Sequence, residues 1–130
     1  RSALAFKIDG IILTENQSVN ENHFMTKTAC GGIDKVPFTS VSNLSSALRT
    51  LKENGYWVYG LDGNSEKKIT DTDFAKKSVF IFGSESDGMR HLTKSSCDEI
   101  VKIEISNNLE SLNVSNSAAV LFFYLNNNKN

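Results

Sequence analysis

Two short stretches of the sequence carry polar side chains whose types and spacing suit chemistry. The first, at 83–88, reads Gly-Ser-Glu-Ser-Asp-Gly and directly follows an apolar run. Its two glycines imitate the start of a phosphate-binding loop, but Met89 stands where such a loop needs lysine. Glu85 and Asp87 would also repel a phosphate. This stretch therefore argues against a triphosphate site and favours a neutral or cationic ligand, or an acid placed for chemistry.

The second stretch, at 110–115, reads Glu-Ser-Leu-Asn-Val-Ser and follows an asparagine-rich turn at 107–108. Asparagine accepts left-handed backbone angles better than most residues, so a turn is expected there without glycine. Three side chains are able to cap the helix that begins at this point: Ser111, Asn113 and Ser115. From the residues alone, capping by these side chains, and by Glu85 in the first stretch, is favoured over a role in catalysis.

Both polar stretches follow sequences that are typical of strands, and the strands position them. The run 79–82 is apolar without a break, which predicts a strand buried on both faces of a parallel sheet. A second apolar strand is predicted at 100–103. In open α/β sheets, ligands collect beyond the carboxyl ends of the strands. The two stretches are therefore expected at the ligand-binding edge of one sheet.

Further strands and helices alternate along the rest of the chain. A short buried strand is predicted at 9–13, and further strands are predicted at 36–38 and 56–61, with Pro37 at an edge or entry position. Helices are predicted at 1–6, at 24–29, from Ser42 or Asn43 to Gly55, and through Ala118, Leu121, Phe122 and Leu125. The segment 65–77 is expected to be a solvated connection or a short helix, and the tail 126–130 is expected to fray. This alternation predicts an α/β fold with a mainly parallel sheet flanked by helices.

The composition narrows the class of protein. A chain of 130 residues with 39% hydrophobic and 22% charged residues is typical of one soluble globular domain. Its net charge of −1 provides no global basic field to attract RNA, so nucleic-acid binding would rest on a local patch or on a further part of the protein. The cysteines and histidines, Cys30, Cys97, His23 and His91, lack zinc-site spacing, so no metal is expected and both cysteines are expected to be reduced packing residues.

The sequence also predicts the setting of the protein. No apolar run approaches the roughly 20 residues that a membrane span needs, and no secretory leader is present, so a cytoplasmic location without a membrane partner is expected. The chain begins at Arg1 rather than at methionine, which suggests a fragment, a processed product or a shortened chain.

Two motifs together indicate a family. Phe-Gly-Ser-Glu-Ser-Asp-Gly-Met at 82–89 and Glu-Ser-Leu-Asn-Val-Ser at 110–115 resemble the second and third signature motifs of the SpoU (TrmH) branch of the SPOUT RNA methyltransferases. The resemblance implies a SPOUT-type α/β fold with a C-terminal trefoil knot, binding of S-adenosylmethionine, methylation of a ribose 2'-hydroxyl in RNA, and a homodimer. Arg1-Ser-Ala resembles the end of the first motif. The resemblance thus implies one domain, 1–130, that lacks its first strand and most of that motif.

The resemblance also implies roles for individual residues. It places catalysis on Arg1, Glu85 and Asn113, with Ser111 adjacent, and cofactor binding on Gly83, Ile103 and Leu112, with Gly88, Ile105 and Leu61 nearby. The apolar members suit an adenine ring, which favours an apolar slot with backbone amides as its polar partners. An arginine has a pKa above about 12 and is not a base, but it lowers the pKa of a neighbouring hydroxyl and binds a nearby phosphate.

Several positions depart from the family pattern. Ser86 replaces a common glycine, Glu104 and Ile105 replace a proline and a methionine, and Asn116 replaces an apolar residue. Glu104 adds a carboxylate beside the expected adenine site. The resemblance in the loop and at 51–58 favours a guanosine of large-subunit ribosomal RNA over transfer RNA as the substrate. The alternatives are a noncatalytic remnant that folds or dimerises and binds cofactor without methylating RNA, and an unrelated nucleotide-binding α/β module.

Overall fold

A computed structural model describes residues 1–14, 36–83 and 89–128 of the chain. These residues belong to two compact units, one formed by Arg1–Leu44 with Phe122–Asn130 and the other by Ser45–Leu121. The helix predicted at 24–29 lies outside the described residues, and the expectation of one domain stays a prediction.

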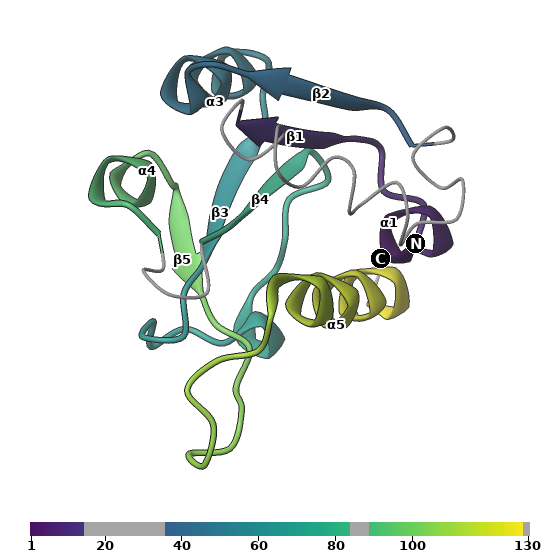
Figure 1. Cartoon of the computed structure of the whole chain (residues 1–130), viewed down its shortest axis with the longest axis vertical. Coiled ribbons are helices and arrows are strands. Elements are labelled where there is room, and N and C mark those ends of the chain that lie inside the picture. Colours follow the sequence, from purple (N-terminus) through teal and green to yellow (C-terminus); the bar gives the residue numbers. More distant parts are fainter. Residues whose placement is uncertain (15–35, 84–88, 129–130) are drawn as a thin grey trace. The chain divides into compact units, whose positions relative to one another are not determined.

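The larger unit is built on a three-stranded parallel sheet. Strand β3 (Trp57–Leu61) lies in the centre, between β4 (Ser78–Phe82) and β5 (Glu99–Val101) (Figure 1). In the register, Leu61 pairs with both Phe82 and Val101, so the three strands end at the same edge. The predicted strands at 56–61, 79–82 and 100–103 are confirmed as parallel neighbours, although β5 ends two residues earlier than expected.

The central strand carries two fully buried side chains, whereas β4 carries none. Val58 and Tyr59 are 0% and 1% exposed, whereas all five residues of β4 are only half-buried. The expectation that 79–82 is buried on both faces is therefore wrong. Among the described residues, β3 has a partner strand on each side and β4 has a partner on one side only. The apolar run of β4 therefore forms an outer strand of this sheet.

Gly60 allows the side chains of neighbouring segments to approach β3. A Cβ atom at this position would lie 2.7 Å from Met89 Cε, 2.8 Å from Cys97 Sγ and 2.9 Å from Ile100 Cδ1. These contacts are closer than a carbon atom tolerates, so the space above Gly60 is already filled. Glycine is needed here because of packing.

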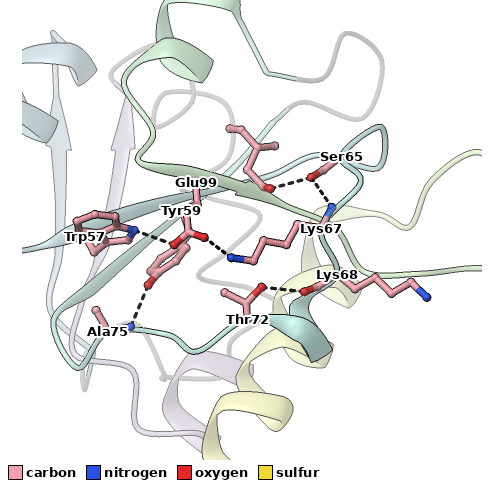
Figure 2. Close-up of polar contacts among 9 residues, drawn as sticks. Trp57, Tyr59, Ser65, Lys67, Lys68, Thr72, Ala75 and Glu99 are labelled. Carbon is pink, nitrogen blue, oxygen red and sulfur yellow. Dashed lines mark hydrogen bonds and ion pairs between the residues drawn. The ribbon is translucent and has the colours of Figure 1, made fainter.

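The connection from β3 to β4 is ordered around an aromatic cluster. Tyr59 stacks on Phe80 with ring centroids 5.4 Å apart, and Phe74 meets both rings edge-on. The Tyr59 hydroxyl accepts a hydrogen bond from the Ala75 amide at 2.9 Å, and burial raises the pKa of this phenol (Figure 2). The 3-10 helix η2 (Ile69–Asp71) lies in the same connection, where Ile69 is buried. The segment 65–77 therefore packs against the sheet and is not only a solvated link.

Helix α3 (Leu44–Glu53) agrees with its sequence signals. It begins just after the predicted cap positions Ser42 and Asn43, and Leu48 on its apolar side is 2% exposed. Gly55 follows the last turn with a φ of +88°, a left-handed conformation that glycine adopts without strain. Helix α4 (His91–Ser95) follows the first polar stretch.

The smaller unit contains a second parallel pair. Strand β1 (Ile11–Thr14) pairs with β2 (Phe38–Val41), and helix α1 (Ser2–Ala5) precedes them. Both strands begin two residues later than predicted, and Ile12 is 39% exposed, so the expected burial of 9–13 is wrong. Pro37 lies just before β2, and its carbonyl accepts a hydrogen bond from the Ile11 amide at 2.9 Å, which confirms the entry position.

Helix α5 (Val114–Asn127) closes the described chain and is longer than predicted. The side-chain amides of Asn127 and Asn128 donate to the carbonyls of Phe123 and Tyr124, each at 2.8 Å. The bond to Tyr124 satisfies one of the last four carbonyls of α5, which have no partner within the helix. The expectation that the tail frays is therefore wrong for 126–128, and 129–130 lie outside the described residues.

Replacing Gly60 with alanine tests the packing above β3. We expect G60A to lower the free energy of unfolding by about 1–3 kcal/mol, because three neighbouring side chains must move to admit one methyl group. Gly63→Ala is the matched control, since a Cβ at Gly63 would meet nothing within 4 Å. Urea denaturation of both variants checks the expectation. Equal stability of the two variants would contradict it.

Candidate cofactor and catalytic site

The carboxyl edge of the three-stranded sheet brings separate parts of the chain together. Because Leu61 pairs with Phe82 and with Val101, the residues that follow these strands leave the sheet side by side. Adjacent strands lie about 4.8 Å apart, so Gly83 and Lys102 leave the sheet with roughly 10 Å between them. The structure thus places Leu61, Gly83 and the beginning of the segment that carries Ile103 at one edge.

Asp62 begins the turn after β3 and links three segments at this edge. Its Oδ1 accepts a hydrogen bond from the Asn64 amide at 2.9 Å, and its Oδ2 lies 3.0 Å from Lys94 Nζ on α4. Its own amide donates to the Val101 carbonyl at 2.9 Å. The Asn64 hydrogen bond and then Lys94 lower the pKa of the Asp62 carboxyl. The carboxylate therefore stays charged at neutral pH and joins the turn to α4.

Ser65 and its neighbours fasten the same turn to the end of β5. The Ser65 hydroxyl donates to the Ile100 carbonyl at 2.7 Å and accepts from the Lys67 amide at 3.2 Å (Figure 2). The Lys102 amide donates to the Lys67 carbonyl at 2.8 Å, and the Ile69 amide donates to the Lys102 carbonyl at 2.9 Å. The chain leaving β5 is therefore held against the turn that leaves β3.

The apolar residues predicted to hold the cofactor are half-buried. Four of them are described in the larger unit: Leu61, Ile103, Ile105 and Leu112. Between two of them, Glu104 is exposed and forms an ion pair with Lys68, with Nζ and Oε2 2.5 Å apart. The extra carboxylate that the sequence adds beside the expected adenine site is therefore offset by a lysine. The predicted cofactor residue Gly88 lies outside the described residues.

Asn113 caps helix α5. Its Oδ1 accepts a hydrogen bond from the Asn116 amide at 2.8 Å, the bond expected of an N-cap side chain. Of the three candidate caps, the structure thus assigns this bond to Asn113. The bond engages the side-chain oxygen and not the NH₂ group. Ser111, two residues earlier, is exposed. A capping role for Asn113 is confirmed, and it leaves a catalytic role open.

The predicted catalytic residues do not all fall in one unit. Ser111 and Asn113 lie in the larger unit, and Arg1 lies in the smaller one. Arg1 is exposed, and its carbonyl accepts a hydrogen bond from the Ala5 amide at 2.9 Å in the first turn of α1. Glu85 lies outside the described residues. Within the described part of the chain, neither unit therefore contains the complete set.

Cys97 is half-buried and packs beside Gly60. Its Sγ lies 3.4 Å from the Thr93 carbonyl and 3.9 Å from Met89 Sδ, and burial raises the pKa of the thiol to about 11. A thiol with this pKa is protonated at neutral pH and is a poor nucleophile. The prediction of a reduced packing residue is confirmed for Cys97, and Cys30 lies outside the described residues.

Among residues 1–14, 36–83 and 89–128 there is no group of three or more His, Cys, Asp or Glu side chains that could hold a metal ion. No helix in this part of the chain has the length and apolar character needed to cross a membrane.

The similarity to known proteins extends well beyond the two motifs. Residues 1–123 match the model of the SpoU rRNA Methylase family. The chain belongs to this family. The match covers the three parallel strands, the turn at Asp62 and most of α5, so it includes every element of the candidate site.

Relatives of known activity are similar along nearly the whole chain. The chain is 37% identical over 123 residues to the 23S rRNA (guanosine-2'-O-)-methyltransferase RlmB of Xanthomonas campestris pv. campestris, which covers 95% of this chain and 49% of that protein. It is 36% identical over 121 residues to the protein of the same name from Neisseria meningitidis serogroup B, with coverages of 93% and 48%. The chain thus spans about half the length of the curated relatives it matches.

Solved structures show the same architecture. The SpoU methyltransferase AviRb from Streptomyces viridochromogenes, in complex with the cofactor AdoMet, matches with a TM-score of 0.82 and 21% identity over 98% of this chain and 50% of its own. An AdoMet-bound rRNA methyltransferase from Sinorhizobium meliloti matches with a TM-score of 0.81 and 20% identity over 95% of this chain and 47% of its own. The predicted α/β fold with parallel strands flanked by helices is confirmed.

Sequence reasoning missed Asp62, Ser65 and Lys94 as parts of the site. The Asp62-Gly63 pair marks a turn, which was the available signal. The pattern does not show that the aspartate binds Lys94, because the two residues come from different elements and meet only through the sheet register.

Replacing Asp62 with asparagine tests the link to α4. The pKa of Asp62 is lower in the folded protein than its ordinary value of 3.8, so its charge stabilises the fold above that pH. This contribution is lost as the pH falls through the folded pKa. We expect D62N to be about 0.5–1 kcal/mol less stable at pH 7, with the difference from the unmodified chain shrinking below about pH 4.

Urea denaturation between pH 3 and pH 7 checks this expectation, with Asp73→Asn, a change at an exposed acidic residue of the same unit, as the control. A difference between D62N and the unmodified chain that stays constant across the whole range would contradict the assigned role of the carboxylate charge.

Proposed function

We propose that this chain is a methyltransferase domain that uses S-adenosylmethionine to methylate a ribose 2'-hydroxyl of RNA. The observation that carries the proposal is the parallel register of β3 with β4 and β5, which brings Leu61, Gly83 and the segment of Ile103 to one edge. Ligands bind at such edges in α/β sheets. Membership of the SpoU rRNA Methylase family and the activities that the similar proteins are named for support the same reaction.

The proposed substrate is a guanosine of large-subunit ribosomal RNA. Both curated relatives described above are named as 23S rRNA guanosine-2'-O-methyltransferases. With a net charge of −1, the chain would depend on local basic groups, or on further parts of the protein, to hold RNA. The proposal includes a single SPOUT domain over 1–130, a C-terminal trefoil knot, a homodimer and a cytoplasmic location, and it assigns no role to a metal.

The residues at the sheet edge fit the cofactor chemically. The half-buried side chains of Leu61, Ile103, Ile105 and Leu112 offer apolar surface to an adenine ring. Gly83, with Gly88 beyond it, allows backbone groups to approach closely, because glycine has no side chain. When bound, S-adenosylmethionine supplies an electrophilic methyl group on a sulfonium.

The catalytic residues act on the ribose in this proposal. The Arg1 guanidinium lowers the pKa of the 2'-hydroxyl and binds the phosphate next to it, because a fixed positive charge favours the ionised form of a neighbouring oxygen. Glu85 orients Arg1. Asn113 is fixed at the start of α5 by its capping bond, so its NH₂ group has a defined position from which to bind the ribose, with Ser111 beside it.

Direct binding and transfer measurements test the proposed function. We expect S-adenosylmethionine to bind the chain in a calorimetric titration, and labelled methyl groups to pass to the 2'-oxygen of guanosine in 23S rRNA fragments. Cofactor binding without transfer to any RNA would favour a remnant that has kept only the binding site. An absence of detectable binding at millimolar cofactor would overturn the proposal.

Substitutions of Asn113 separate its structural role from its proposed catalytic role. Aspartate caps a helix as well as asparagine does but lacks the NH₂ group. We expect N113D to keep the stability of the unmodified chain and to lose at least about tenfold in methyl transfer, as expected when a group that positions the substrate is removed. N113A is expected to lose both transfer and about 1 kcal/mol of stability.

Asn116→Asp is the matched control, since it makes the same chemical change one turn into α5, at a side chain outside the proposed site. Full transfer activity in N113D would show that Asn113 acts only as a cap.

A further inference from the structure

We infer that Lys68 and Glu104 form a positioning ion pair that holds Ile103 and Ile105 in the geometry that binds the cofactor. The inference rests on the proposed function and extends it to two residues that touch neither cofactor nor RNA. Lys68 belongs to the turn after β3, and Glu104 belongs to the segment after β5. Their side chains meet with Nζ and Oε2 2.5 Å apart.

The Lys68 end of the pair is anchored. The Lys68 carbonyl accepts hydrogen bonds from the Thr72 hydroxyl at 2.8 Å and from the Asp71 amide at 3.1 Å (Figure 2). The next residue, Ile69, is 5% exposed and fixes the start of η2 in the core. The backbone that carries the ammonium group is therefore held by the packed part of the larger unit.

The Glu104 end lies where regular structure stops. Strand β5 ends at Val101, and Lys102 forms an isolated parallel bridge with Lys68. The described chain from 103 to 113 then forms neither helix nor strand before α5 begins. The ion pair therefore ties this segment to the anchored turn at Glu104, two residues beyond the backbone bridge at Lys102.

The burial pattern shows what the pair would position. Ile103 and Ile105 are half-buried, whereas Glu104 between them is exposed, as expected of an extended segment whose side chains alternate. A contact on the Glu104 side fixes the rotation of the segment about its own axis. It thereby keeps the two isoleucines directed to the opposite side, where the proposed cofactor site lies.

Both groups remain charged over the neutral range. The hydrogen bond between them lowers the pKa of Glu104 and raises the pKa of Lys68. Their charges therefore do not change between about pH 5 and pH 10. Because both side chains are exposed to solvent, salt weakens their attraction. The effect of the pair on cofactor binding should accordingly depend on salt and not on pH near neutrality.

Calorimetric titration of the chain with S-adenosylmethionine tests the inference. In about 0.1 M salt we expect E104Q and K68M each to weaken binding about two- to fivefold, the range typical of an exposed ion pair. In about 1 M salt, where screening extends over only a few ångströms, these differences from the unmodified chain should largely vanish. The double variant K68E/E104K restores the pair with reversed charges and is expected to restore binding at low salt.

Glu66→Gln is the matched control, because it removes an exposed carboxylate two residues from Lys68, and it is expected to bind cofactor like the unmodified chain. Unaltered binding by E104Q and K68M at low salt would overturn the inference. So would a loss that is equal at both salt concentrations and is not restored by the charge swap, since this would indicate direct contact with the cofactor or general damage to the fold.

Hydrogen exchange separates failure of this inference from failure of the proposed function. Without any ligand, we expect faster exchange at the amides of 103–105 in E104Q than in E66Q. If the unmodified chain bound no cofactor while this difference was present, the pair would still position the segment and the proposed function would be wrong. If cofactor bound and exchange was equal in the two variants, the positioning role would be wrong.

Discussion

The larger unit depends on one buried strand, β3, which forms parallel ladders on both sides. Its backbone groups bind β4 and β5, and the side chains of Val58 and Tyr59 are removed from water. A buried backbone group without a partner is costly, so this strand has little freedom to shift its register. The register fixes where the segments after the three strands leave the sheet. The proposed cofactor site depends on that edge. Gly60 shows how tightly the same strand is covered, since no side-chain atom fits there.

Polar contacts made by the turn after β3 join it to the neighbouring segments at this edge. Asp62 binds Lys94 on α4, Ser65 binds the carbonyl of Ile100, and Lys68 binds Glu104. These contacts join the turn after β3 to α4, to β5 and to the segment that follows β5. An apolar slot for adenine needs such support, because dispersion contacts with a flat ring do not by themselves set the orientation of the segments that provide them. The strand register defines the edge of the sheet, and the contacts of the turn after β3 determine the local shape of that edge.

Departures from the family pattern take on a physical meaning in this setting. Glu104 stands between two candidate cofactor residues, Ile103 and Ile105, and adds an exposed carboxylate there. Lys68 offsets that charge. Asn113 illustrates the converse, because a residue that the family resemblance implies in catalysis is also the N-cap of α5. One side chain serves both roles only if its oxygen and its NH₂ group are used separately, which fits an amide better than a hydroxyl.

The sequence by itself determined the classes of element, the parallel α/β fold and the family. Continuous apolar runs mark strands, helical spacing places Leu48 and Leu121 inside, and the paired motifs at 82–89 and 110–115 are specific because neither is explained by packing alone. Tertiary structure decided which strand is central, because the apolar run of β4 exceeds that of β3 and yet β3 has the two partners. It also decided the pairs Asp62–Lys94 and Lys68–Glu104, since charged residues from distant segments meet only after the sheet has set their positions. Local patterns record the preferences of neighbouring residues, whereas these contacts depend on the register between strands.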